Sequence, residues 1–164
     1  MISQNLALLF QETALRYPTK KALFYKEGQK YTSMDWAEVQ RRVETLASFF
    51  LEQGLKPGDR VAILSENRPE WLITDFAALS VGASTVPVYT TLSAPEIRYI
   101  LSDSSCRWVA VSGKPLYEKL CAIQKDLPVL EGIIAFDSAL LLPPRVRGLP
   151  RDFDAVPAWT SPWG

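Results

Sequence analysis

The sequence contains no histidine. Without this residue, the chain cannot by itself build a Ser-His-Asp or Cys-His catalytic centre or a metal site with imidazole ligands. Cysteine is almost as scarce, and the spacing of Cys106 and Cys121 matches no metal-ligand motif. We therefore expect two reduced thiols, as in a cytoplasmic protein, rather than a disulfide.

Glycine is too sparse to build a phosphate-binding loop. The eight glycines stand at positions 28, 54, 58, 82, 113, 132, 148 and 164, and no two lie within three residues of each other. Rossmann and Walker loops need closely spaced glycines, whose backbone N–H groups point at the phosphates. We therefore assign no catalytic or metal-binding residue in this chain, and the cofactor-binding residues stay unassigned.

The charge has no excess of either sign, with 18 basic and 18 acidic residues. This balance argues against nucleic acid as a partner. The sequence shows no signal peptide and no transmembrane segment, because the longest apolar stretch, residues 76–89, is broken by polar residues and a proline. A loose basic cluster near the start is interpreted as solvated surface, with a lipid-binding patch as the alternative; it consists of Arg16, Lys20, Lys21, Lys26 and Lys30.

The rest of the chain is organised around residues 58–91. A short apolar run, Val61 to Leu64, predicts a buried strand, and the pattern from Glu70 to Val81 predicts a helix that begins near Pro69. Asn67 is the expected cap of this helix. A second apolar run, Thr85 to Tyr89, completes a parallel strand–helix–strand unit.

Further elements on both sides of this unit predict an α/β fold with a partial doubly wound, mostly parallel sheet and flanking helices. Ser93 and Glu96 form the pattern of a capping box, and we expect Thr32 or Ser33 to cap the longest helix. The other expected helices cover residues 5–17, 33–53, 94–101 and 114–125, the expected hairpin pairs residues 22–25 with 29–32, and two more strands cover residues 107–111 and 132–136.

The composition changes near residue 137. Five prolines lie between residues 137 and 164, and no helical or strand periodicity persists there. We therefore divide the chain into a folded part, residues 1–136, and a proline-rich tail, residues 137–164, which we expect to be irregular.

Three stretches resemble the early signature of AMP-forming long-chain acyl-CoA synthetases. They are residues 55–71, LKPGDRVAILSENRPEW; residues 82–93, GASTVPVYTTLS; and residues 96–104, EIRYILSDS. The resemblance extends from about Leu6 to Phe136 and implies the opening part of such an enzyme's N-terminal domain. It also implies that the complete enzyme uses a fatty acid, ATP, Mg²⁺ and coenzyme A.

The resemblance does not extend to the family's Ser/Thr/Gly-rich ATP loop, which is absent from these residues. We therefore expect this chain to make no acyl-adenylate alone. The alternative is a non-catalytic binding or assembly module that self-associates or pairs with a chain carrying the missing part. A cytoplasmic location is expected, with peripheral association at a membrane as a further expectation for an enzyme of apolar substrates.

Tyr89, Thr90 and Thr91 are the residues that we expect nearest the substrate. They stand at the end of the second strand of the central unit, and open α/β sheets bind ligands at the carboxyl ends of their strands. Ser65, Glu66 and Asn67 also follow a strand, but for them we expect helix capping. Trp71 is expected to pack rather than to line an acyl tunnel.

Overall fold

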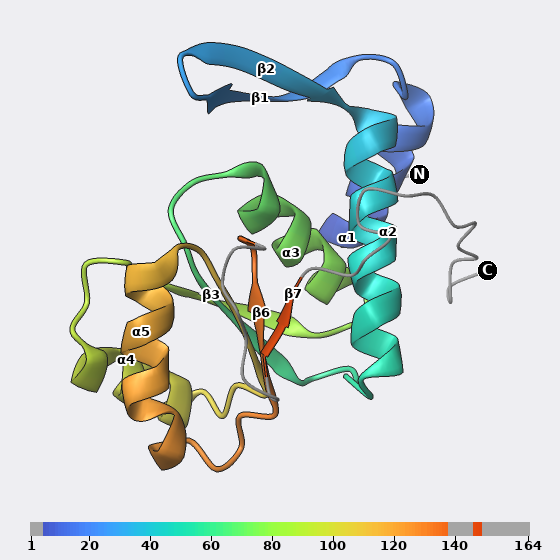
Figure 1. The fold of residues 1–164 in the computed structure, drawn as a ribbon. Helices are drawn as coiled ribbons and strands as arrows, with labels where there is room; N and C mark the ends of the chain where they lie inside the picture. The colour runs from blue at the N-terminus through green and yellow to red at the C-terminus, as the bar shows by residue number, and fades with distance from the viewer. Residues whose placement is uncertain (1–4, 138–145, 149–164) are drawn as a thin grey trace.

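A parallel sheet forms the centre of the fold (Figure 1). The computed structural model describes residues 5–137 and 146–148. In the order in which they lie side by side, the strands are β4 (Ser84–Val88), β3 (Arg60–Leu64), β5 (Trp108–Val111), β6 (Gly132–Ala135) and β7 (Val146–Gly148). Every neighbouring pair is parallel, which confirms the predicted α/β fold class.

Helices cover both faces of the sheet. They are α1 (Leu6–Arg16), α2 (Trp36–Glu52), α3 (Pro69–Ser80), α4 (Ala94–Asp103) and α5 (Lys114–Ile123), which continues into the 3₁₀ turn η1 (Gln124–Asp126). Side chains of β3 alternate between the faces, so that Val61 packs with α2 and α3 while Ala62 packs with α4 and α5. None of the helices in the described part of the chain is long and apolar enough to cross a bilayer.

The predicted strand–helix–strand unit is confirmed as β3, α3 and β4. The register places Val61 opposite Thr85 and Leu64 opposite Val88. Gly82 follows α3 with a φ of +78°, and a Cβ atom at this position would lie 3.1 Å from the Pro57 side chain. Both the positive φ and the close approach of Pro57 favour glycine at the end of this helix.

The expected cap of α2 is wrong. Thr32 and Ser33 lie in the hairpin strand β2 (Lys30–Asp35), which pairs with β1 (Lys21–Glu27). The strand continues to Asp35, whose Oδ1 accepts a hydrogen bond of 2.9 Å from the backbone N–H of Glu38. Asp35 is therefore the residue that caps the longest helix.

The expected cap of α3 is also wrong, and the reason lies in Pro69. A proline restricts the residue before it to extended backbone, and Arg68 indeed has φ −154° and ψ 163°. Arg68 therefore becomes the N-cap residue, although its side chain makes no capping hydrogen bond. Asn67 stands one position too early to cap the helix.

The tail from residue 137 is not irregular throughout. Val146–Gly148 form β7, which pairs in parallel with β6. A three-residue strand is too short to show a periodicity, which explains why the sequence did not reveal it. Residues 138–145 and 149–164 lie outside the described part of the chain, and the division at residue 136 stays a prediction.

Arg107 joins three loops at the amino edge of the sheet, where the strands begin. Its guanidinium binds both carboxylate oxygens of Glu131 at 2.8 and 2.6 Å. It also contacts the Asp59 carboxylate and donates to the carbonyl oxygen of Gly54 at 2.9 Å. The α2–β3 loop and the η1–β6 loop are thereby fixed to the start of β5 by one side chain.

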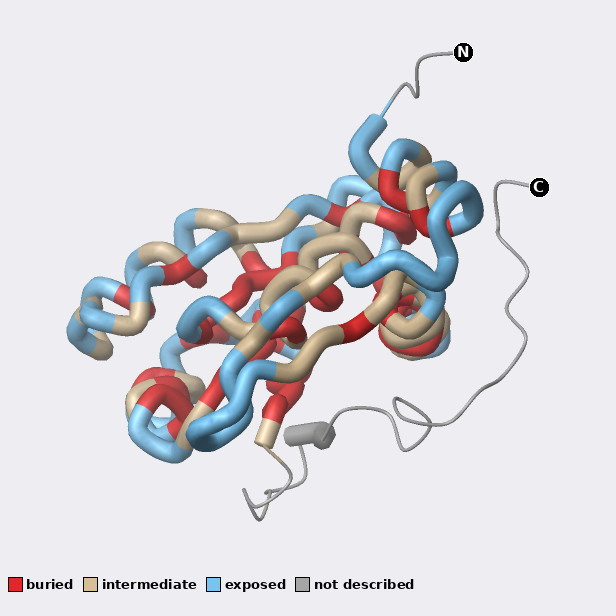
Figure 2. The backbone as a smooth tube through the Cα atoms, turned by 90° about the horizontal axis from the view of Figure 1, so that it is seen from above, coloured by how far each residue is buried: buried red, intermediate tan, exposed pale blue. Residues whose placement is uncertain are grey.

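The β1–β2 hairpin projects from the body of the molecule beside the start of α2 (Figure 1). Leu23, Tyr25 and Met34 on one face pack against the hydrophobic core. Buried residues are concentrated in the central strands and on the inner sides of the helices, whereas many peripheral residues are exposed (Figure 2).

Both cysteines are free, as the sequence predicted. Cys106 is buried and Cys121 is exposed. Burial raises the pKa of the Cys106 thiol, with a smaller opposing contribution from the hydroxyl of Ser104. The buried thiol therefore stays protonated at neutral pH and acts as a packing residue.

Candidate functional site

The carboxyl edge of the sheet gathers the polar residues that follow the strands. Parallel pairing places the ends of β3, β4, β5 and β6 at the same edge. The segments that begin there are residues 65–68 after β3, 89–91 after β4, 112–113 after β5 and 136–137 after β6. In open α/β sheets this edge is where ligands bind, so it is the candidate site.

Tyr89, Thr90 and Thr91 lie at this edge, after the outermost strand, β4. The Tyr89 side chain is 80% exposed, Thr91 is exposed and Thr90 is half-buried. Lys119 of α5 fixes the backbone here, because its Nζ donates to the carbonyl oxygens of Thr90 at 3.1 Å and Leu92 at 2.8 Å. The segment therefore has an anchored backbone, and its role beside a substrate stays a prediction.

Ser65 and Glu66 do not cap α3, contrary to the expectation. The Ser65 hydroxyl donates to the carbonyl oxygen of Glu66 at 2.9 Å. The Glu66 carboxylate accepts a hydrogen bond from the hydroxyl of Ser112, which follows β5. These contacts link the end of β3 to the end of β5 instead of satisfying the first N–H groups of the helix.

Arg68 is the centre of a second network, which links β3 to β6. Its Nε donates to Glu70 at 2.7 Å, and its Nη1 donates to Asp137 at 3.1 Å. Asp137 also accepts the backbone N–H of Gly113 at 2.7 Å. The guanidinium lies 5.6 Å from the centre of the Phe136 ring, within the range of a cation–π contact.

The electrostatics of Arg68 follow from these partners. Burial alone would lower the pKa of its guanidinium, but the hydrogen bonds and charges of Glu70 and Asp137 outweigh that effect and raise it. The guanidinium therefore stays charged, paired with two carboxylates. The sequence did not predict this cluster, because Arg68 and Asp137 stand far apart in the chain and come together only through the parallel strand order.

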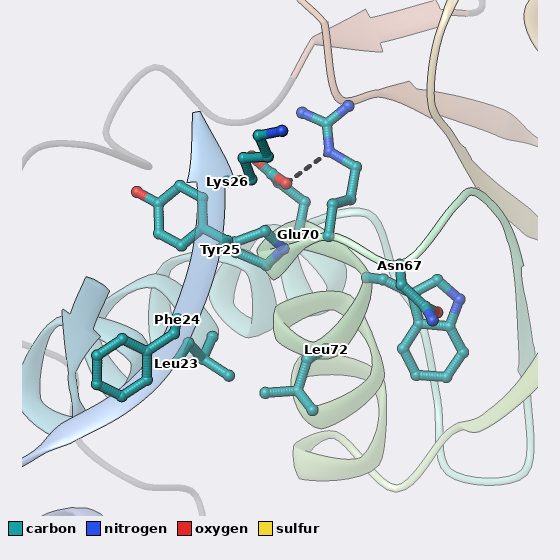
Figure 3. Close-up of a pocket in the computed structure, with 10 residues that line it drawn as sticks. Leu23, Phe24, Tyr25, Lys26, Asn67, Glu70 and Leu72 are labelled. Carbon is teal, nitrogen blue, oxygen red and sulfur yellow. Dashed lines mark hydrogen bonds and ion pairs between the residues drawn. The ribbon is translucent and has the colours of Figure 1, made fainter. Parts of the chain in front are cut away.

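A groove of about 710 Å³ lies between β1 and the first turn of α3, beside this network (Figure 3). Trp71 is half-buried and lines it, which the sequence did not predict. Leu23 and Leu72 contribute apolar surface, and Glu70 brings the Arg68 network to the rim. The other lining residues are Phe24, Tyr25, Lys26, Asn67, Arg68 and Pro69.

The charged side chains of this edge bind one another. The described residues contain no group of three His, Cys, Asp or Glu side chains that could hold a metal ion. Arg68 already neutralises carboxylates, and Glu66 points its carboxylate at Ser112. An apolar groove with a charged rim suits an amphipathic ligand or a polypeptide surface.

The chain matches the family model described as AMP-binding enzyme over residues 10–154. It is 31% identical over 132 residues to the long-chain-fatty-acid–CoA ligase ACSBG2 of Xenopus laevis, which covers 80% of this chain and 18% of that protein. It is 45% identical over 74 residues to the long-chain-fatty-acid–CoA ligase FadD15 of Mycobacterium tuberculosis, covering 45% of this chain and 12% of that protein. The chain thus spans less than a fifth of the length of either relative.

Solved structures show the same fold. The inhibitor-bound N-terminal domain of FACL13 from Mycobacterium tuberculosis matches with a TM-score of 0.73 and 28% identity, covering 83% of this chain and 34% of that one. The anthranilate CoA ligase AuaEII, in complex with anthranoyl-AMP, matches with a TM-score of 0.75 and 26% identity, covering 82% of this chain and 25% of that one. The doubly wound sheet described above is therefore a fold that these ligases share.

Proposed function

The chain belongs to the family of AMP-binding enzymes, and on that premise we propose that it forms the opening part of the N-terminal domain of a long-chain fatty acid–CoA ligase. The observation that carries the proposal is the family match over residues 10–154, together with the similarity to ligases named for long-chain fatty acids. The sheet, with helices on both faces, supports it because the solved ligases share this fold.

The proposed reaction of the complete enzyme has two steps. A fatty acid carboxylate attacks the α-phosphorus of ATP, which forms an acyl-adenylate and releases pyrophosphate. The thiolate of coenzyme A then attacks the acyl carbon, which forms the thioester and releases AMP. Phosphoryl chemistry of this kind requires the phosphate charge to be neutralised, usually by Mg²⁺ together with hydrogen-bond donors.

The residues described here do not fit a triphosphate site. Arg68, a cation of the carboxyl edge, is paired with Glu70 and Asp137, and the nearby Glu66 adds a further carboxylate. A polyphosphate placed there would meet an excess of negative charge. We therefore propose that this chain makes no acyl-adenylate alone and that the ATP phosphates are bound by residues outside it.

The contribution proposed for this chain is one wall of the substrate site. Tyr89, Thr90 and Thr91 follow the edge strand β4, and Lys119 holds the backbone here through the carbonyl oxygens of Thr90 and Leu92. An anchored loop with exposed side chains suits contact with a substrate, because its position is fixed while its surface stays available. We assign these three residues as substrate-proximal and give them no catalytic role.

Two measurements test the proposal. The purified chain of 164 residues is assayed for pyrophosphate release with ATP, Mg²⁺ and palmitate, and we expect no turnover. A chimera is then made in which residues 10–136 replace the corresponding segment of FadD15, and we expect it to form palmitoyl-CoA. Turnover by the isolated chain would overturn the proposed inactivity, and a folded chimera without activity would overturn the proposed function.

The alternative, an assembly module, has less support in the structure. The edge strand β4 carries Pro87, and prolines on edge strands hinder pairing with a further strand. Sedimentation of the isolated chain distinguishes the alternatives, because an assembly module would form a dimer at micromolar concentration. We expect a monomer.

A further inference from the structure

Helix α5 places an exposed thiol beside a buried phenol. Tyr117 and Cys121 are four residues apart in this helix, so their side chains lie on the same side of it. Tyr117 packs in the core that α4 and α5 form with the sheet and is only 9% exposed, whereas Cys121 is exposed. One turn of α5 therefore leads from the core to solvent.

The hydroxyl of Tyr117 is a buried donor beside a poor acceptor. No nitrogen or oxygen among the described residues forms a hydrogen bond with its Oη. The polar group next to it is the side chain of Cys121, whose sulfur accepts hydrogen bonds only weakly. A buried donor without a good partner costs free energy, which an oxygen atom at this position would recover.

The phenol keeps its proton at neutral pH. Burial raises the pKa of Tyr117 to about 12, and the hydrogen bond to Cys121 and the charge of its thiolate act in the same direction. The hydroxyl is therefore available as a donor and does not act as a base. An acceptor that forms on the Cys121 sulfur would meet this donor in the folded chain.

The second thiol in the chain has the opposite environment. Cys106 is 2% exposed, and its Sγ lies 3.1 Å from the hydroxyl oxygen of Ser104. Burial raises the pKa of Cys106, so it is a poor nucleophile as well as an enclosed one. Cys106 is thus an internal reference for the reactivity of Cys121, and its burial keeps it from condensing with an oxidised Cys121.

We propose that Cys121 is a modification site at which a hydroperoxide forms a sulfenic acid, and that Tyr117 stabilises this product. The Cys121 thiolate attacks one peroxide oxygen, the S–O bond forms as the O–O bond breaks, and the leaving oxygen takes the electron pair together with the proton that the thiol released. Sulfur is oxidised by two electrons and the peroxide is reduced. The new oxygen then accepts the hydrogen bond of the Tyr117 hydroxyl.

The modification is reversible with a small thiol. The thiol attacks the sulfenic sulfur, which forms a mixed disulfide and releases water, and a second thiol molecule then restores Cys121 and leaves as the small disulfide. A donor that holds the sulfenic oxygen slows the first of these steps, because the hydrogen bond has to be broken. The proposal goes beyond the proposed function and does not depend on ligase activity.

The test treats the full, folded chain with hydrogen peroxide and traps sulfenic acid with dimedone. Mass spectrometry of the peptides that contain Cys106 and Cys121 then gives the extent of labelling at each thiol. We expect Cys121 to be labelled about tenfold faster than Cys106, because exposure governs access of the oxidant. In urea the two thiols should react at similar rates, which shows that the difference comes from the fold.

Tyr117→Phe tests the role of the hydroxyl, since it keeps the ring. After catalase removes the peroxide, the rate at which a small thiol reduces the Cys121 sulfenic acid is measured. We expect this rate to rise about fivefold in Tyr117→Phe, the effect of one hydrogen bond, while the rate of oxidation stays unchanged. The control is Tyr99→Phe, which removes the hydroxyl of a 68% exposed tyrosine on α4 and should change neither rate.

Three results would overturn the proposal. The first is equal labelling of the two cysteines in the folded chain, or none at Cys121. The second is a reduction rate that is unchanged in Tyr117→Phe or that rises as much in Tyr99→Phe. The third is a disulfide as the main product of oxidation. Urea unfolding verifies that both variants are folded, which separates loss of the hydroxyl from loss of structure.

Discussion

The two edges of the parallel sheet are each organised by an arginine, and they differ in what surrounds it. At the amino edge, Arg107 binds Glu131, Asp59 and the Gly54 carbonyl, all of which belong to short loops between elements. At the carboxyl edge, Arg68 binds Glu70 and Asp137 on the rim of a groove of about 710 Å³. Both clusters use the same chemistry, but Arg68 itself lines the larger groove.

This difference suggests that the amino edge stabilises the fold, whereas the carboxyl edge binds a ligand. At the amino edge, the hydrogen bonds of Arg107 connect the loops that carry Gly54, Asp59 and Glu131. The carboxyl edge fixes the ends of β3, β5 and β6 and leaves the β4 end with Tyr89 exposed. We therefore expect substitutions at the amino edge to change mainly stability and those at the carboxyl edge to change mainly ligand contact.

The largest effect is expected from adding one methyl group at the amino edge. A Cβ atom at Gly132 would lie 2.3 Å from the ring of Trp108, in the buried start of β6. The ring has to move within a packed core, so Gly132→Ala should destabilise the chain by about 3 kcal/mol, measured by urea unfolding.

The matched substitution at the other edge is Gly113→Ala. Gly113 has a φ of +66°, and the nearest contact of an added Cβ, to Pro115, is an ordinary 3.7 Å. Only backbone strain is introduced, and the expected cost is about 2 kcal/mol, because φ +66° with ψ 150° is a conformation almost confined to glycine. If Gly132→Ala and Gly113→Ala lowered the free energy of unfolding equally, the proposed difference in stability between the amino and carboxyl edges would be wrong.

The next largest effect is expected at the two arginines. Arg107→Met leaves Asp59 and Glu131 without their cation and frees two loops, and we expect a loss of about 2 kcal/mol. Arg68→Met should cost about 1 kcal/mol, because its Asp137 partner is more exposed than Asp59. The free energies of unfolding of both variants are measured in urea. A larger loss of stability in Arg68→Met than in Arg107→Met would contradict the assignment of the stabilising role to the amino edge.

A smaller effect is expected from Asp59 on the free energy of unfolding at acidic pH. Burial raises the pKa of Asp59, but the backbone N–H of Lys56 and the Arg107 guanidinium outweigh it and hold that pKa below its usual value of 3.8. A depressed carboxyl pKa stabilises the fold above the pKa of the unfolded chain, and this contribution is lost as the pH falls through the folded value.

Asp59→Asn tests this dependence. The variant is expected to be less stable than the original chain at pH 6 and to lose less additional stability between pH 4 and pH 2, as followed by urea unfolding at each pH. The same acid slope in both chains would show that Asp59 is not held in its ionised form by Arg107.

The sequence was sufficient to predict the central part of the fold. The βαβ unit, the capping box at Ser93 and the parallel direction of the strands follow from local patterns, and the structure confirms them. Local patterns fail where a neighbouring residue changes the backbone. Pro69 makes Arg68 the N-cap in place of Asn67, and the length of β2 moves the cap of α2 from Ser33 to Asp35.

The candidate site was harder to predict, because its contacts cross between strands. The position of Tyr89 after β4 can be read from the sequence, since strand ends are local features. The contacts of Arg68 with Asp137 and of Ser112 with Glu66 depend on which strands lie side by side. A single sequence offers no signal for such pairs until the strand order is known.

The smallest effect on stability is expected from substitution of Asn67. This residue distinguishes a helix-capping role at the carboxyl edge from a ligand-binding role. The sequence alone predicted a loss of about 1 kcal/mol through the cap. Because Arg68 occupies the N-cap position, we expect Asn67→Ala to change the free energy of unfolding by less than about 0.5 kcal/mol. Asp35→Ala, which removes the observed cap of α2, should still cost about 1 kcal/mol and serves as the control.

Asn67 also lines the groove between β1 and α3, so the same variant probes ligand contact. In the chimera with FadD15, a change in fatty acid binding without a change in stability would place the groove among the substrate contacts. Unchanged binding together with unchanged stability would leave Tyr89, Thr90 and Thr91 as the part of the carboxyl edge to test for substrate contact. A loss of about 1 kcal/mol would instead restore Asn67 as a cap and contradict the role of Pro69 in setting the start of α3.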